Sequence, residues 1–96
     1  HNAVVLNRII GESETLSCNK TRGGMFSVIN ISKLNIDSDS FCTDLLRSTS
    51  VAATPGVIFG KDWDDHIRVS LGGDKAEFLE AISHLVRFAD NEVIRR

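Results

Sequence analysis

The clearest pattern of apolar and polar positions lies near the C-terminus of the chain. Apolar residues recur there at steps of three and four, a period typical of an amphipathic helix. The apolar positions are Phe78, Leu79, Ile82, Leu85, Val86, Ala89 and Val93. Two glycines precede Asp74, and Glu77 follows three residues later, which resembles a capping box. We therefore predict a docked helix of about five turns.

Residues 66–71 follow a different period, because apolar and polar side chains alternate. The apolar set is Ile67, Val69 and Leu71, and the polar set is His66, Arg68 and Ser70. This alternation predicts a strand with one face in the core and the other face open. Arg68 would project from the interior of that strand, on the same face as His66.

The N-terminal third combines a helical stretch with two strand-like segments. Residues 3–10 have apolar side chains at helical spacing and stop at Gly11, which indicates the tail of a longer helix that begins upstream. Residues 15–19 and 25–32 are rich in Ser, Thr, Val and Ile, with Gly23 and Gly24 between them. We predict two strands separated by a bend.

A second helix is predicted in the middle of the chain, after a loop at residues 33–37. Either Asp37 or Ser38 can cap it, and it should end near Thr49. Its apolar stripe would consist of Phe41, Cys42, Leu45 and Leu46.

The segment after this helix predicts a short strand. Residues 51–54 are apolar and β-prone, and they stop at the turn pair Pro55 and Gly56. Residues 61–65 then form a polar, acidic turn. The resulting order of elements is typical of an α+β fold, in which a small, mainly antiparallel sheet packs against helices. Residues 1–96 would form one such domain, ending in the long amphipathic helix.

Composition and charge narrow the class of protein. Apolar residues make up 42% and charged residues 25% of the chain, as in an ordinary globular domain. The net charge of −2 gives no electrostatic reason to expect nucleic-acid binding. No apolar stretch approaches the ~20 residues that cross a bilayer, and no signal-peptide pattern is present, so we expect a soluble, cytoplasmic protein. Because the chain opens at His1 rather than Met, we expect its true start to lie elsewhere.

The sequence gives little indication of metal or thiol chemistry. Cys18 and Cys42 form no Cys-x-x-Cys pair and have no His at ligand spacing, so we expect two buried free thiols and no zinc site. The acidic turn at residues 61–65 lacks the Gly and Glu that an EF-hand calcium loop needs at its sixth and twelfth positions. We expect no metal site.

Arg68 is the main candidate for a binding residue. A guanidinium held at a sheet face can bind a carboxylate through two parallel hydrogen bonds. The structural alternative is an ion pair between Arg68 and an Asp or Glu of the sheet surface. The alternating pattern alone leaves both open.

Three segments of the chain carry a resemblance to a known family. Residues 23–32 begin with two glycines and a Met-Phe pair. Residues 40–60 contain Val-Ala-x-x-Pro-Gly and Phe-Gly, and residues 66–88 contain Ile-Arg-x-Ser and the long helix. In this order and spacing, over about two-thirds of the chain, they resemble the C-terminal small domain of class I aminotransferases, of the aspartate aminotransferase family.

The resemblance implies a role for particular residues. Arg68 would bind the α-carboxylate of an amino-acid or 2-oxo-acid substrate, and Met25 and Phe26 would lie near the cofactor cleft. Residues 51–56 would lead back toward the active site. The cofactor, pyridoxal phosphate, would be held by a large domain upstream, and the parent enzyme would be a homodimer. No catalytic residue would lie in this chain, which would be inactive alone.

Lys20 belongs to a motif that some enzymes use for catalysis. Ser17 to Lys20 fits a Ser-x-x-Lys pattern, but Lys20 lies only 48 residues before Arg68, and the aminotransferase family separates its cofactor lysine from the arginine by far more. The companion motifs of β-lactamases are absent too, so Lys20 is not expected to be catalytic.

The alternative function is a self-standing α+β binding module without catalysis, in which Arg68 is structural or binds a small carboxylate.

Overall fold

Helices and strands follow one another in the order that the sequence predicts. The computed structural model describes residues 2–18 and 25–95, with the side chains of residues 93–95 left out. In these ranges the elements are α1 (Asn2–Gly11), β1 (Ser17–Cys18), β2 (Phe26–Asn30), α2 (Ser38–Thr49), β3 (Thr54–Pro55), β4 (His66–Ser70) and α3 (Lys75–Arg95). Short 3-10 turns, labelled η, add η1 (Ser32–Leu34), η2 (Gly56–Phe59) and η3 (Lys61–Trp63). The predicted turn with Gly23 and Gly24 lies outside the described residues.

The described strands form an antiparallel sheet with the order β1-β2-β4-β3, which confirms the predicted α+β fold. β2 pairs with β4 so that Val28 lies opposite Arg68. β3 adds at the other edge of β4, where Thr54 lies opposite Arg68. The strand predicted at residues 51–54 is therefore placed too early. The observed strand β3 includes Pro55. An edge strand tolerates a proline because no neighbouring strand needs the missing N–H.

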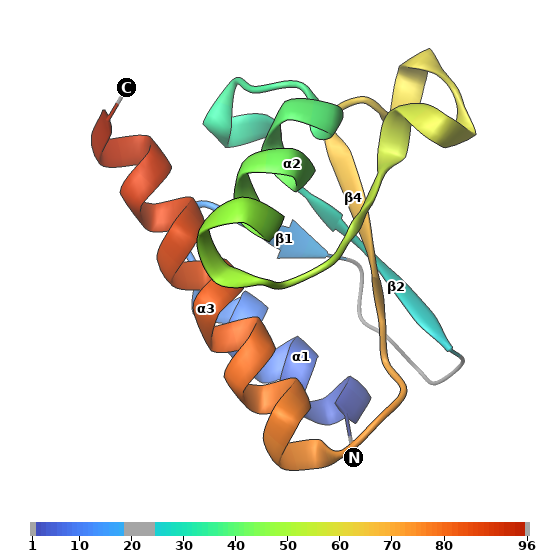
Figure 1. Cartoon of the computed structure of the whole chain (residues 1–96), viewed down its shortest axis with the longest axis vertical. Coiled ribbons are helices and arrows are strands. Elements are labelled where there is room, and N and C mark those ends of the chain that lie inside the picture. The colour runs from blue at the N-terminus through green and yellow to red at the C-terminus, as the bar shows by residue number, and fades with distance from the viewer. Residues whose placement is uncertain (1, 19–24, 96) are drawn as a thin grey trace.

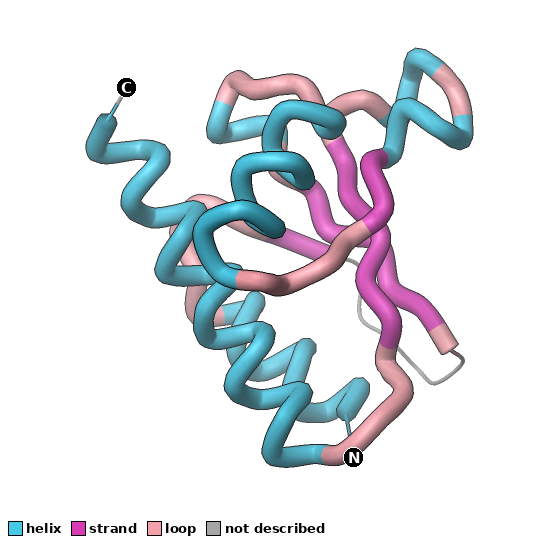
Figure 2. Tube along the Cα trace, in the orientation of Figure 1, coloured by secondary structure: helices cyan, strands magenta, loops and turns pink. Residues whose placement is uncertain are grey.

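The helices cover one face of the sheet, as Figure 1 and Figure 2 show, and the core lies between the two layers. Ile29, Ile67 and Val69 point into this core and are at most 5% exposed. On the other face, Phe26 is 50% exposed and Val28 is 39% exposed. Neighbouring residues along β2 and β4 thus lie on opposite faces of the sheet, one in the core and one on the open face, which confirms the period-two prediction for β4.

The cap predicted for α2 is confirmed, but its apolar stripe is partly wrong. Asp37 is the N-cap, and its carboxylate accepts a hydrogen bond from the Ser40 N–H at 3.0 Å. Phe41 and Leu45 are fully buried against the sheet and α3. Leu46 is 52% exposed, because one residue turns the helix by about 100° and takes the side chain out of the contact.

Helix α3 also begins as predicted, since Asp74 accepts a hydrogen bond from the Glu77 N–H at 3.1 Å. Its buried stripe differs at the edges: Leu79 is 38% exposed, whereas Phe88 is 8% exposed and packs edge-on against Phe41. No described helix combines the length and the apolar character that a membrane span requires.

Both cysteines are free, and their environments differ. Cys42 is buried, as predicted, but Cys18 is only partly buried. Burial, with a smaller effect of the Asp39 charge, raises the pKa of Cys42 to about 12, and burial also raises the pKa of Cys18. The thiolate form is therefore disfavoured at both positions, which makes them poor nucleophiles near neutral pH.

Candidate functional site

Arg68 projects from the middle of β4 onto the open face of the sheet, as the sequence predicts. Its guanidinium carbon lies 4.2 Å from the centroid of the Phe26 ring and 5.0 Å from the centroid of the Phe59 ring. A cation is attracted to the face of an aromatic ring, and two rings together limit the directions in which the guanidinium can swing. β2 supplies the first ring, and the turn η2 supplies the second.

The charge of Arg68 is not neutralised by a carboxylate in the described part of the chain. The ion pairs found there join Asp65 to His66 and Glu80 to His84, and neither includes Arg68. An Arg is always charged in proteins and forms strong bidentate hydrogen bonds with carboxylates. The structural alternative for Arg68, an ion pair on the sheet surface, is thus not seen within residues 2–18 and 25–95.

A pocket of about 280 Å³ opens beside Arg68. It is lined by Val28, Gly56, Phe59, Trp63, His66, Ile67 and Arg68. Apolar walls with a small number of convergent polar groups are typical of small-molecule sites. The guanidinium makes a carboxylate or another planar anion the best chemical match for this pocket.

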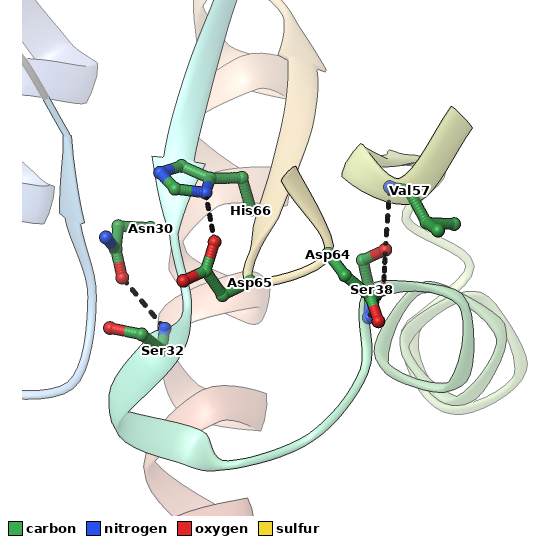
Figure 3. Close-up of polar contacts among 7 residues, drawn as sticks. All are labelled: Asn30, Ser32, Ser38, Val57, Asp64, Asp65 and His66. Atoms are coloured by element: carbon green, nitrogen blue, oxygen red, sulfur yellow. Dashed lines mark hydrogen bonds and ion pairs between the residues drawn. The ribbon is translucent and has the colours of Figure 1, made fainter. Parts of the chain in front are cut away.

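His66 lies on the same face as Arg68 and lines the same pocket, as the alternation predicts. Its Nδ1 lies 2.6 Å from the Asp65 carboxylate, as Figure 3 shows, and its ring packs edge-on against Trp63 at 5.0 Å between centroids. The carboxylate and the indole therefore fix the imidazole from two sides.

The other residues that the sequence singled out have different outcomes. Phe26 contacts Arg68, whereas Met25 just precedes β2, is 66% exposed and accepts a hydrogen bond through its carbonyl from the Leu71 N–H at 2.8 Å. Gly56, the last residue of the segment 51–56, lines the Arg68 pocket. Lys20 lies outside the described residues.

Sequence reasoning missed two aromatic residues of the site. Phe59 was noticed only as part of a Phe-Gly motif, and Trp63 lies in a turn that was described as polar. A large aromatic residue in a short polar turn was the available signal, because such side chains usually need a surface to pack on. Here that surface is the open face of the sheet.

The comparisons with known proteins point in one direction. No protein-family model matches the chain. Tyrosine aminotransferase of Caenorhabditis elegans is 30% identical over 77 residues, which are 79% of this chain and 17% of that protein. Aspartate aminotransferase of Pyrococcus horikoshii is 27% identical over 71 residues, which are 74% of this chain and 18% of that protein.

A solved structure shows the same fold. A pyridoxal-phosphate-dependent aminotransferase from Streptococcus suis aligns with a TM-score of 0.85 and 21% identity, covering 94% of this chain and 23% of that one. The chain therefore spans less than a fifth of the length of the curated relatives and about a quarter of the solved structure. These findings confirm the resemblance to aminotransferases that the motifs indicated.

Proposed function

Because the neighbours of this chain in sequence and in fold are aminotransferases, we propose that it is the small domain of a larger, pyridoxal-phosphate-dependent aminotransferase. In this proposal Arg68 binds the α-carboxylate of an amino-acid or 2-oxo-acid substrate. The observation that carries the proposal is a guanidinium without a carboxylate partner in the described chain, held over two rings beside a pocket.

The task of Arg68 is to orient the substrate. A bidentate contact with the carboxylate fixes both the position and the plane of that group, which a single point charge would not do. Phe26 and Phe59 restrict the guanidinium before the substrate arrives, so less freedom is lost on binding. Once the rest of the enzyme covers the apolar walls, they would exclude water and strengthen the charge contact.

The cofactor has to be held by the rest of the enzyme. When bound, pyridoxal phosphate supplies the electron sink for the reaction, and it needs a lysine amine for its attachment. The described lysines are Lys33, Lys61 and Lys75, and none of them lines the Arg68 pocket. Among the described residues, the Arg68 pocket therefore has no lysine that could attach the cofactor, and the role that we propose for this chain is to bind the substrate. Met25 and Phe26 would flank the cofactor cleft. That the complete enzyme is a homodimer in the cytoplasm is a prediction from the sequence alone.

Substitution of Arg68 tests this proposal in the complete protein. Arg68→Ala should weaken the binding of an amino acid by about 2–3 kcal/mol, because a charge-assisted bidentate contact is lost. The absorption of the bound cofactor should persist, since its attachment does not involve this side chain. The measurement is a spectroscopic titration of the cofactor with the amino acid.

Arg87→Ala is the matched control, because Arg87 is exposed on α3 and does not line the pocket. It should bind the amino acid like the wild type. An unchanged affinity in Arg68→Ala would contradict the assignment.

The aminotransferase proposal and the self-standing binding module predict different coding sequences upstream of residue 1. Translation of the coding sequence upstream of residue 1 should reveal a cofactor-binding domain if the chain is part of an aminotransferase. A start codon directly before residue 2 would instead favour the binding module.

A further inference from the structure

A polar cluster around the buried Ser38 lies at the start of α2, and its members do not line the Arg68 pocket. Ser38 is 0% exposed, and its hydroxyl donates a hydrogen bond to Asp64 Oδ1 at 2.8 Å. The Ser38 N–H donates to the same oxygen at 3.1 Å, and the Val57 N–H donates to the Ser38 hydroxyl at 3.0 Å. Figure 3 shows Ser38 between Asp64 and Val57.

The hydrogen bonds of the Ser38 hydroxyl do not cap the first turn of the helix, although Asp64 also accepts the Ser38 N–H, one of the free donors of that turn. Asp37 already accepts the Ser40 N–H of the first turn. The Ser38 hydroxyl instead connects α2 to Val57 and Asp64, which lie 19 and 26 residues further along the sequence. The cluster is therefore a tertiary link between α2 and the chain that follows β3.

The linked segment is the one that forms the aromatic wall of the Arg68 pocket. Val57 belongs to η2, which contains Phe59, and Asp64 directly follows η3, which contains Trp63. At the start of the segment, Gly56 packs so closely that a Cβ there would lie 2.0 Å from the Trp63 carbonyl oxygen. One buried serine thus holds both ends of a turn whose aromatic side chains face the site.

We propose that Ser38 and Asp64 are positioning residues for the substrate site: they hold Phe59 and Trp63 in place and, through the Phe59 ring, the guanidinium of Arg68. The inference rests on the proposed role of Arg68 in binding the substrate carboxylate. Loss of the Ser38 hydroxyl would leave the Val57 N–H without its partner and would remove one of the two hydrogen bonds to Asp64. The segment would then shift, and a small shift of one wall is enough to misplace a bidentate contact.

Trp63 provides a direct reporter, because it is the one Trp of this chain. The complete protein is labelled with 5-fluorotryptophan, and the Trp63 resonance is assigned by its loss in Trp63→Phe. The fluorine shift and line width then report on the position of the turn without reference to any substrate. The apparent affinity for an amino acid is measured on the same samples.

Ser38→Ala should move or broaden the Trp63 resonance and weaken amino-acid binding roughly tenfold, with a smaller change in kcat. Ser40→Ala is the matched control, because it removes a hydroxyl from the same helical turn without touching Asp64 or Val57 in the structure. It should leave both readouts as in the wild type. Asp64→Asn keeps an acceptor oxygen and should resemble the wild type more than Asp64→Ala does.

An unchanged Trp63 resonance in a cooperatively melting Ser38→Ala protein would overturn the inference. If Ser38→Ala does not fold, Asp64→Ala removes both hydrogen bonds between Ser38 and Asp64 from the partly exposed end of the cluster and tests the position of the same turn. Failure of the proposed function has a different signature. In that case Arg68→Ala leaves the affinity unchanged, while the Trp63 resonance in Ser38→Ala still decides whether the cluster positions the turn.

Discussion

A guanidinium on a sheet face can be satisfied by a carboxylate of the protein, by solvent or by a ligand. In this chain Arg68 lies over two aromatic rings and takes part in none of the ion pairs of the described residues. The rings orient the cation but do not neutralise it, because a ring supplies only a partial negative face. In the proposed function, the anion that binds Arg68 comes from outside the described chain.

Gly56 lies at a crowded position of the turn beside Arg68. A Cβ at this position would lie 2.0 Å from the Trp63 carbonyl oxygen and 2.5 Å from the His66 carbonyl oxygen. Both neighbours are backbone atoms of structured segments, so they cannot move aside cheaply. Gly56→Ala should therefore lower the free energy of unfolding of the 96-residue chain by roughly 3 kcal/mol, measured by urea denaturation.

Gly11→Ala is the control for this measurement. A Cβ at Gly11 would meet nothing within 4 Å, so the substitution should be close to neutral. Equal losses of stability in the two variants would show that the close approach at Gly56 is not what constrains the turn.

At the residue scale, the sequence indicated Arg68 as a candidate binding residue but gave no indication of the tertiary hydrogen bonds of Ser38. Arg68 was visible because the alternating pattern places a charged residue in the middle of a predicted strand. Ser38 was considered only as a possible helix cap, since a serine at a helix start is ordinary. Its burial depends on Asp64 and Val57, which approach from distant parts of the sequence. Tertiary hydrogen bonds of this kind leave no periodic signal.

Among the elements, the long periodic segments could be predicted with nearly correct bounds, whereas the bounds of the short strands could not. Helix α3 and strand β4 were predicted at nearly their observed bounds, because many positions contribute to each pattern. Strands β1 and β3 have two residues each, and they are strands because β2 and β4 pair with them. Leu46 and Leu79 were assigned to the core because apolar spacing cannot show where a contact surface ends.

The Asp37 cap of helix α2 should make the stability of the chain depend on pH. Hydrogen bonds from Ser40 lower the pKa of Asp37 below its ordinary value of 3.8. Because the folded pKa is depressed, the stabilisation is present above about pH 4 and is lost as the pH falls through the folded pKa. Asp37→Ala should cost about 0.5–1 kcal/mol near neutral pH, at the lower end for a cap because the carboxylate is exposed.

Asp37→Asn separates the charge from the cap, because the amide oxygen can still accept the Ser40 N–H. Urea midpoints of the wild type and Asp37→Asn should differ by a constant amount between pH 5 and 8, as rough limits, and converge in acid. A difference that does not change down to the lowest pH would show that the Asp37 charge contributes nothing to α2.

At the scale of the whole molecule, the sheet has one covered face and one open face. The open face and the turns beside it expose large apolar side chains, namely Phe26, Val28, Phe59 and Trp63. Exposed apolar groups gathered around a cation are typical of a surface that meets another part of a protein or a ligand. The curated relatives are more than five times as long as the segments that match this chain. In the proposed enzyme, the remaining sequence would meet the open face and complete the site.

Two substrates of the complete enzyme distinguish a carboxylate-binding Arg68 from a structural one. One is an amino acid, and the other is the primary amine that lacks only its carboxylate. In Arg68→Ala, kcat/KM for the amino acid should fall by roughly 30- to 160-fold, while kcat/KM for the amine should stay near the wild-type value. Equal falls for both substrates would contradict the account, because Arg68 would then act on the structure of the site and not on the carboxylate.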